Sequence, residues 1–363
     1  MSDSRPAVRL DHVDRRIVAA LQADPRGSWA QLGAVVSVSE TTVLRRVQRM
    51  RDGGVLEVVA APDPLHCGFG QPVLLQFRTV PGKAPALARY LAERADSRFV
   101  ALLTGRSDVL CELIAPDRRY LSQFLNAQVP TTGAVLGTTS EIVLRTFKTR
   151  DQWSRTLLDP DAAPATPSPR PIAPAEKNAK LDKMDLRLLA ALGGDGRRSY
   201  ADLSAELGLS ETAIARRVSA LTAANKLYFV AMVDSAALGF DLEVMMRLRV
   251  ELAALESIAS DLAAMPEVRY ISATTGYSDL AFEGIFKDND ALYDFVTHSL
   301  GALKGIREVE ADVMLDIIKR AYRYPLFAGG SPVKAGVDTA PGTSRRAPEK
   351  ASRRGAAAKK GSR

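Results

Sequence analysis

Cysteine and histidine are scarce in this sequence. Its 363 residues include two cysteines and three histidines. Cys67 and Cys111 form no CxxC pair, so we expect small apolar core residues instead of a disulfide or metal ligands. His12, His66 and His298 lie far apart along the chain and form no recognisable metal or catalytic cluster. The sequence therefore predicts no metal site, no catalytic residues and no cofactor.

Long apolar runs are also missing. No run approaches the roughly 18 residues needed to cross a bilayer. The first residues, MSDSRPAVRLDHVDRR, carry acids and lack the apolar core of a secretory leader. We therefore expect no membrane partner and a cytoplasmic location. The chain is 46% hydrophobic and 25% charged, as globular proteins are, and its length predicts about two to four domains.

Positive charge is concentrated at the end of the chain. The formal net charge is +7, and residues 328–363 hold nine Lys/Arg and two Asp/Glu, so the remainder is formally neutral. A DNA-binding surface in the folded part must therefore come from local clustering of charge. Because residues 328–363 are rich in Gly, Ala, Pro and Ser, we expect a disordered basic tail.

An internal repeat organises the chain. LDHVDRR at Leu10 recurs as LDKMDLR at Leu181, and the same offset of 171 residues relates the two halves without a gap. We call the two halves the first and second copies. Between them, residues 154–179 hold six prolines. This composition indicates an extended, semi-rigid, Pro-rich linker.

The first part of each copy predicts a winged helix-turn-helix domain, over residues 8–61 and 180–234. Two helices with apolar spacing precede a tight turn, a serine-capped third helix and a β wing. Gly208 lies in the second turn, but Ser37 occupies the matching position of the first. A non-glycine residue at positive φ costs about 1 kcal/mol. The first turn should therefore be slightly strained or have a different geometry.

The exposed face of each third helix carries the predicted DNA contacts. Arginine binds guanine or phosphate, and Ser/Thr reach base edges or phosphates, so this composition suits a helix in the major groove. The predicted contacts are Thr41, Thr42, Arg45, Arg46 and Arg49 in the first copy, and Thr212, Arg216, Arg217 and Ser219 in the second. Arg46 and Arg217 fit contacts to the phosphate backbone equally well. A merely solvated face is the alternative, which recurrence in two copies disfavours.

Residues 69–150 and 240–325 each show the element order β-α-β-β-α-β. This order predicts a four-stranded antiparallel sheet with both helices on one face. The simplest cover for the other face is the same face of the fused second copy. The expected fold class is α+β, with two winged helix-turn-helix domains and two ferredoxin-like βαββαβ domains in a tandem duplication that forms an intramolecular pseudo-dimer.

The LDxxDxx start, the SETxxxRRV third helix, the wing and the GxSD loop together resemble the leucine-responsive regulatory protein/asparagine-regulator (Lrp/AsnC) family. The resemblance implies double-stranded DNA as a partner, a homo-oligomer, and a small-molecule effector, typically an amino acid, bound at subunit interfaces. It places the effector at Gly105, Asp108, Gly276 and Asp279, with Thr104, Thr275 and Tyr277 nearby. Glycine admits a carboxylate, and Asp accepts from an α-ammonium group. Ordinary hairpin chemistry remains the alternative for these loops.

Two other functions fit part of the sequence. The architecture also resembles sirohaem-type decarboxylases, which occur as fused pairs. Their chemistry is expected to use histidines and arginines around a tetrapyrrole, and no histidine is shared between the copies. The basic tail fits a nucleoid-architectural protein with little sequence preference, whereas the differing third helices favour specific readout. The sequence thus predicts a sequence-specific transcriptional regulator and not an enzyme.

Overall fold

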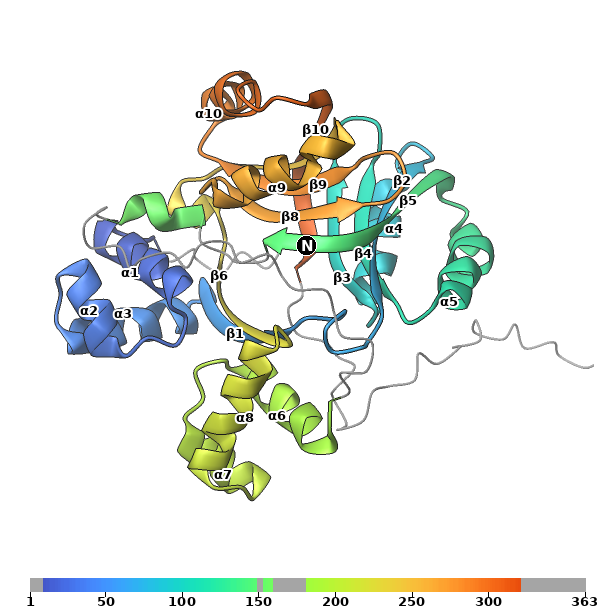
Figure 1. The fold of residues 1–363 in the computed structure, drawn as a ribbon. Helices are drawn as coiled ribbons and strands as arrows, with labels where there is room; N and C mark the ends of the chain where they lie inside the picture. Colours follow the sequence, from blue (N-terminus) through green and yellow to red (C-terminus); the bar gives the residue numbers. More distant parts are fainter. Residues whose placement is uncertain (1–8, 149–152, 159–180, 321–363) are drawn as a thin grey trace, which may run out of the picture. The chain divides into compact units, whose positions relative to one another are not determined.

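The computed structural model describes residues 9–148, 153–158 and 181–320, all within a unit that spans Met1–Pro332 (Figure 1). The expected basic tail, and the expected linker beyond residue 158, lie outside the described residues. The elements of the first copy recur in the same order in the second.

Each copy begins with three helices and a wing strand. The helices and wings are α1 (His12–Ala23), α2 (Trp29–Val36), α3 (Glu40–Asp52) and β1 (Leu56–Pro62), then α6 (Lys183–Gly194), α7 (Tyr200–Leu207), α8 (Glu211–Ala223) and β6 (Leu227–Val233). Ser39 and Ser210 cap the third helices, each accepting a hydrogen bond from a backbone N–H of the first turn. Apolar side chains spaced along each helix, such as Val43 and Val47 of α3, form the buried core of the domain.

The turn before α3 has the geometry of its counterpart despite the lack of glycine. Ser37 adopts the left-handed conformation, with φ 59° and ψ 44°, and Gly208 has φ 71° and ψ 30°. The alternative of a different turn is therefore wrong. Ser37 carries the backbone strain instead.

The second part of each copy is a four-stranded antiparallel sheet with two helices. In the first copy the elements are β2 (Gln71–Thr79), α4 (Ala84–Glu93), β3 (Ser97–Leu103), β4 (Val109–Ala115), α5 (Arg118–Gln123) and β5 (Val135–Lys148). In the second they are β7 (Leu242–Val250), α9 (Leu255–Ala264), β8 (Val268–Thr274), β9 (Leu280–Phe286), α10 (Asn289–Asp294) and β10 (Ile306–Arg320). The strand orders are β3-β4-β2-β5 and β8-β9-β7-β10, as a split βαβ arrangement requires.

The two sheets share their edges as well as their inner faces. Strand β5 pairs with β8, and β10 pairs with β3, so the eight strands form one closed ring. Between the sheets, Met245 and Met314 of the second copy pack with Leu103 and Leu110 of the first. The expectation that the second copy covers the first sheet is confirmed, and the edge pairing adds backbone hydrogen bonds that were not predicted.

The wings join the two helix-turn-helix domains. Strands β1 and β6 pair antiparallel along their whole length. Beside them, Arg26 donates to the carbonyl oxygen of Gly196 (2.7 Å), and Arg197 donates to that of Pro25 (2.7 Å). The Arg197 guanidinium also lies 3.7 Å from the centroid of the Trp29 ring. These reciprocal contacts fix each helix-turn-helix domain against the other.

The first residues of the expected linker belong to the fold. Trp153–Leu157 forms a short 3-10 helix that contacts α1. Trp153 is buried there, and the Ser154 hydroxyl donates to Gln22 Oε1 at 2.6 Å. An apolar tryptophan and leucines at the start of this segment give it a partner in the core, so any extended linker begins after residue 158.

Candidate DNA-binding helices and ligand interface

The two aspartates of the LDxxD sequence hold α3 in place. Asp11 caps α1 and accepts a hydrogen bond from Arg46 Nη1 at 2.7 Å. Asp14, which is fully buried, accepts from the same nitrogen at 2.8 Å and also from Arg49. The hydrogen bond from Arg46 lowers the pKa of Asp11 to about 2. Arg46 therefore joins the start of α1 to the middle of α3.

The second copy repeats this ion pair in a more open setting. Arg217 Nη1 donates to Asp182 and Asp185, both at 2.7 Å. The Asp185 side chain is 16% exposed, and alanine (Ala220) replaces Arg49 at the matching position. Arg46 and Arg217, both predicted as DNA contacts, thus bind acids of their own domains. Their contact with phosphate stays a prediction.

Most of the remaining predicted DNA contacts are exposed. Thr41, Arg45 and Arg49 are exposed on α3, and Thr212, Arg216 and Ser219 are exposed on α8. Thr42 is half-buried, and its hydroxyl lies 2.8 Å from that of Ser39. Both helices therefore present an arginine and small hydroxyl side chains to a partner, over the apolar stripe that packs inward.

The two GxSD loops use their aspartates to hold strand ends. Asp108 accepts hydrogen bonds from the Thr79 backbone N–H (2.6 Å) and hydroxyl (3.0 Å). Asp279 accepts from the Val250 backbone N–H at 2.9 Å. Both aspartates therefore stabilise the hairpin, which is the alternative role considered in the sequence analysis. An additional contact of these carboxylates with an effector stays a prediction.

Each loop also contacts the other copy. The Thr104 backbone N–H donates to the Val313 carbonyl (2.9 Å), and the Val313 N–H donates to the Thr104 hydroxyl (3.0 Å). Thr275 and Ile142 make the same two bonds, both at 2.9 Å. The residues predicted near an effector thus lie where the two copies meet, in agreement with a site at a subunit interface.

Glycine is required in the first of these loops. Gly105 has φ +95°, and a Cβ there would clash with the carboxylate of Asp312 on β10. Gly276 has the same φ, and its Cβ would lie 3.3 Å from Glu141 Cγ on β5. A side chain at Gly105 would push the loop away from β10, whereas one at Gly276 would require only a small shift of Glu141.

A cavity of about 650 Å³ lies beside these loops. Its lining comes from both copies: Gln76, Arg78, Arg106, Ser107, Gly137, Thr138, Thr139 and Glu141 of the first, with Arg247, Tyr277 and Glu310 of the second. Of the predicted effector contacts, Tyr277 lines it. Arg247 and Glu141 were not predicted. The signal available in the sequence was that Arg247 matches Gln76 across the repeat, a change of charge at a strand position.

Arg247 and Glu141 are buried charges in this cavity. The Arg247 side chain is 3% exposed; its Nε donates to Glu310 at 3.1 Å, and its Nη2 donates to Asp312. Glu141 is fully buried, and its Oε1 accepts from the Ser278 backbone N–H (3.0 Å) and hydroxyl (2.8 Å). Opposite charges are therefore held rigidly where the two copies meet.

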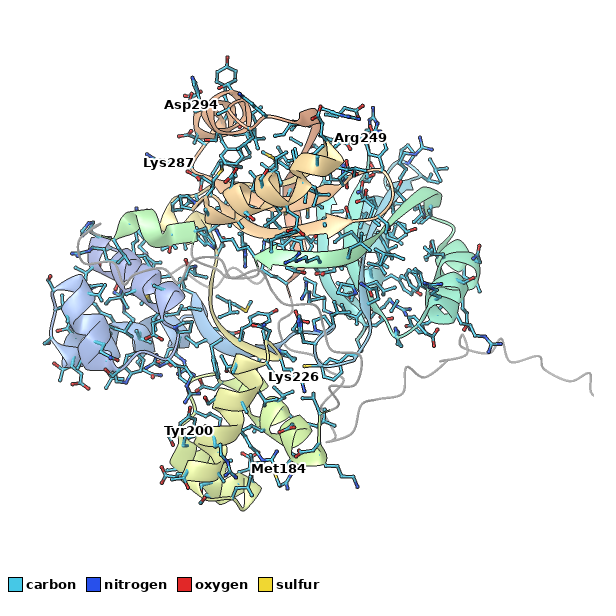
Figure 2. The ribbon with its side chains drawn as sticks, viewed as in Figure 1. Met184, Tyr200, Lys226, Arg249, Lys287 and Asp294 are labelled. Carbon is cyan, nitrogen blue, oxygen red and sulfur yellow. The ribbon has the colours of Figure 1, made fainter. Side chains whose placement is uncertain are left out.

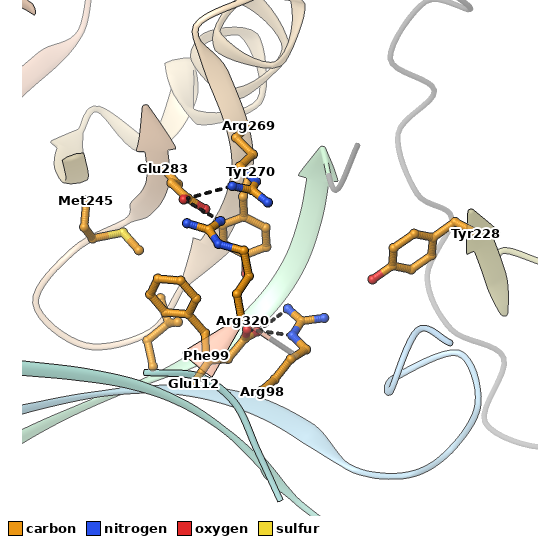
Figure 3. A pocket seen from close by; sticks show the side chains of 10 residues that line it. Arg98, Phe99, Glu112, Tyr228, Met245, Arg269, Tyr270, Glu283 and Arg320 are labelled. Atoms are coloured by element: carbon orange, nitrogen blue, oxygen red, sulfur yellow. Dashed lines mark hydrogen bonds and ion pairs between the residues drawn. The ribbon is translucent and has the colours of Figure 1, made fainter. Parts of the chain in front are cut away.

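A second, much smaller cavity is lined by residues of both copies, and half of them are charged (Figure 3). It holds about 60 Å³. Arg98 Nε donates to Glu112 at 2.7 Å, and Arg320 Nη1 donates to Glu283 at 2.8 Å. Burial raises the pKa of Glu283. The Arg98–Glu112 pair joins the neighbouring strands β3 and β4, and the Arg320–Glu283 pair joins β10 to β9.

In the part of the chain that the structure describes, no group of three or more His, Cys, Asp and Glu side chains could hold a metal ion. Cys67 and Cys111 are both buried, and desolvation raises the pKa of each thiol. None of the described helices is long and apolar enough to cross a bilayer.

Comparison with known families finds four matching segments, two for each copy. An AsnC-type helix-turn-helix domain matches residues 10–51 and 181–222. An Lrp/AsnC ligand binding domain matches residues 73–153 and 243–324. Together these segments cover most of the described residues, with one helix-turn-helix and one ligand-binding match in each copy.

Individual relatives each match one part of this chain over nearly their whole length. The HTH-type transcriptional regulator Ptr1 of Methanocaldococcus jannaschii is 27% identical over 147 residues, which are 40% of this chain and 99% of that protein. The Bkd operon transcriptional regulator of Pseudomonas aeruginosa is 28% identical over 152 residues, 41% of this chain and 99% of that protein. Each relative thus has the length of one copy.

A solved structure spans both copies. The crystal structure of the siroheme decarboxylase NirDL superposes with a TM-score of 0.58 at 14% identity, over 86% of this chain and 94% of that one. At this identity the likeness concerns the fold alone.

Proposed function

We propose that this chain, which belongs to the Lrp/AsnC family as a tandem duplication of the family's two-domain unit, is a sequence-specific transcriptional regulator whose binding to double-stranded DNA responds to a small-molecule effector. We place its action in the cytoplasm, where it meets DNA. The observation that carries the proposal is the pair of capped third helices, α3 and α8, each with an exposed arginine beside hydroxyl side chains.

The paired wings favour recognition of two half-sites by one chain. Strands β1 and β6 and the Arg26 and Arg197 contacts join the two helix-turn-helix domains. Their recognition helices then reach DNA as a unit, as in a dimer. The expected site consists of two half-sites separated by about one helical turn, roughly 34 Å, or a multiple of it.

The two half-sites should differ in sequence. Where α3 carries Gln48 and Arg49, α8 carries Ser219 and Ala220. Shorter side chains reach fewer base edges, so the second copy should discriminate less strongly. Selection of binding sites from random duplexes, followed by footprinting, tests this. A strictly palindromic site read equally by both copies would contradict unequal half-sites, and protection without sequence preference would favour the nucleoid-architectural alternative.

The effector belongs, in this proposal, to the ligand-binding domains. The position of both GxSD loops at the junction of the copies supports contacts from Thr104, Gly105 and Asp108, and from Thr275, Gly276, Tyr277 and Asp279. Assembly of several chains is part of the same proposal, because the ligand-binding domains of this family form oligomers.

A decarboxylase function has weaker support. The likeness to NirDL is one of fold, at 14% identity. None of the three histidines recurs at the matching position of the other copy. We therefore prefer the regulator.

A further inference from the structure

We infer that the first helix-turn-helix domain carries a binding site for a small phosphate ester, on the side of α1 that faces away from α3. The inference goes beyond the proposed function, in which DNA contacts belong to α3 and α8 and the effector belongs to the ligand-binding domains. The ligand class follows from the charge of a cavity beside α1, and the number of sites follows from a difference between the two copies.

A cavity of about 510 Å³ lies beside the first two turns of α1, whose side chains are drawn in Figure 2. Its lining consists of Leu10, His12, Arg15 and Arg16, with Leu157 of the 3-10 helix that contacts α1. Among these described residues there are two guanidinium groups and an imidazole, but no carboxylate. The charge of the lining therefore favours an anion.

The cationic side chains of this cavity are not neutralised by other described residues. The side chains of His12, Arg15 and Arg16 form no hydrogen bond or ion pair within the described part of the chain. Nε of Arg15 is buried and lacks a hydrogen-bond partner there. Buried donors are nearly always paired, because an unpaired donor loses its hydration without compensation. An anion that accepted from this guanidinium would remove that cost.

The shape of a guanidinium and the apolar part of the lining narrow the ligand further. Arginine presents two N–H groups side by side, which match two oxygens of a phosphate. A second arginine and an imidazole lie in the same lining and suit a group with more than one negative charge. Leu10 and Leu157 give the cavity an apolar side. An inorganic ion would leave this side uncovered, whereas a phosphate ester of an apolar group would bury it.

The cavity lies on the side of α1 opposite α3. Asp14 of α1 binds Arg46 and Arg49 of α3. Successive residues of an α-helix are about 100° apart, so side chains two positions away point in nearly the opposite direction. His12 and Arg16 are both two positions from Asp14. DNA bound to α3 would therefore meet the other side of the domain, which favours a small molecule over the DNA backbone as the source of the phosphate.

The second copy lacks this arrangement. Leu186 occupies the position that matches Arg15, and it packs against Ile114 of the first copy. The Arg15 guanidinium instead reaches the loop before β7, where a Cβ on Gly239 would lie 3.7 Å from Nη1. A cation thus replaces an apolar contact between a helix-turn-helix domain and the ligand-binding domain of the other copy. We therefore expect one site per chain.

Isothermal titration calorimetry of the full chain without DNA tests the inference, with phenyl phosphate, inorganic phosphate and phenol as probes. We expect phenyl phosphate to bind once per chain, inorganic phosphate to bind more weakly, and phenol to bind at least about tenfold more weakly than phenyl phosphate. Arg16→Gln should weaken binding of phenyl phosphate by roughly tenfold or more, because it removes one cation from the cavity. Arg187→Gln is the matched control, since Arg187 is exposed at the same position of the second copy, and it should bind like the parent.

Arg15→Leu is the second variant, because leucine occupies the matching position of the second copy. It should also weaken phenyl phosphate by roughly tenfold or more. Thermal unfolding shows whether this variant is intact; if it does not fold, Arg16→Gln decides. Two sites per chain, no binding of phenyl phosphate, equal binding of phenol, or binding indifferent to Arg16→Gln would overturn the inference.

A salt series on random duplex DNA distinguishes the two sources of phosphate. The inference expects Arg16→Gln and Arg187→Gln to give the same slope of log K against log salt. A slope flattened by about one unit for Arg16→Gln alone would assign the arginine to the DNA backbone and overturn the inference. The proposed function stands in each of these cases, because it depends on sequence-specific binding through α3 and α8. Loss of that binding would refute the proposed function and leave the titrations with phenyl phosphate unaffected.

Discussion

Replacing Arg46 by alanine should destabilise the first helix-turn-helix domain, whereas replacing its neighbour Arg45 should not. Arg46 bridges Asp11 and the fully buried Asp14. Arg45 is exposed on the same helix. Arg46 therefore stabilises the fold, and its contact with phosphate is a separate prediction.

The size of the effect depends on how buried each charge is. Breaking a fully buried ion pair costs about 3–5 kcal/mol, and an exposed pair contributes about 0–1 kcal/mol. The Arg46 side chain is 22% exposed, and Arg49 still neutralises Asp14 after the substitution. We therefore expect a loss of about 1–3 kcal/mol in the free energy of unfolding. For Arg217→Ala, where the arginine is 33% exposed, the loss should be nearer 1 kcal/mol.

Tryptophan fluorescence during urea unfolding measures the stability of the first helix-turn-helix domain. Both tryptophans of the chain contact the first helix-turn-helix domain, since Trp29 begins α2 and Trp153 packs against α1. Arg45→Ala is the control: it should leave the unfolding curve unchanged within about 0.5 kcal/mol and weaken specific DNA binding by about 1–3 kcal/mol. If Arg46→Ala unfolded like the parent yet lost DNA binding as Arg45→Ala does, Arg46 would be a DNA contact and the structural role would be refuted.

Two further predictions concern the turn and the tail. Ser37→Gly should raise the free energy of unfolding by up to about 1 kcal/mol, and Gly208→Ser should lower it by a similar amount, because both positions have positive φ; equal unfolding midpoints for the two variants and the parent would contradict this. Ending the chain at Phe327 should flatten the slope of log K against log salt for DNA binding by several units, since each phosphate contact contributes about −0.9. Sequence preference should survive. If the full chain and the shortened chain had identical slopes, on specific and random duplexes alike, the tail would not touch DNA.

Local patterns were sufficient to predict the domains. Helical spacing, serine caps and the offset of 171 residues identified two helix-turn-helix and two βαββαβ domains, and the family matches confirm both kinds. The left-handed turn at Ser37 was also within reach, because a glycine occupies the matching position of the second copy.

Contacts between distant charged residues were not predictable in the same way. Arg46 looks like any arginine on an exposed helix face until α1 brings two aspartates to it. Arg247 and Glu141 lie where the second copy was expected to cover the first, but which charged residues meet there depends on how the two sheets pair. The edge pairing itself depends on which strands meet across the chain, and sequence periodicity carries no information about that.

The closed ring of eight strands changes how this regulator behaves on dilution. A two-chain relative loses its partner as its concentration falls, because stability and association are then the same equilibrium. Here the strands that close the ring, β3 with β10 and β5 with β8, belong to one polypeptide, so its closure is independent of protein concentration. A cell holding a few molecules of this protein would still present both recognition helices together.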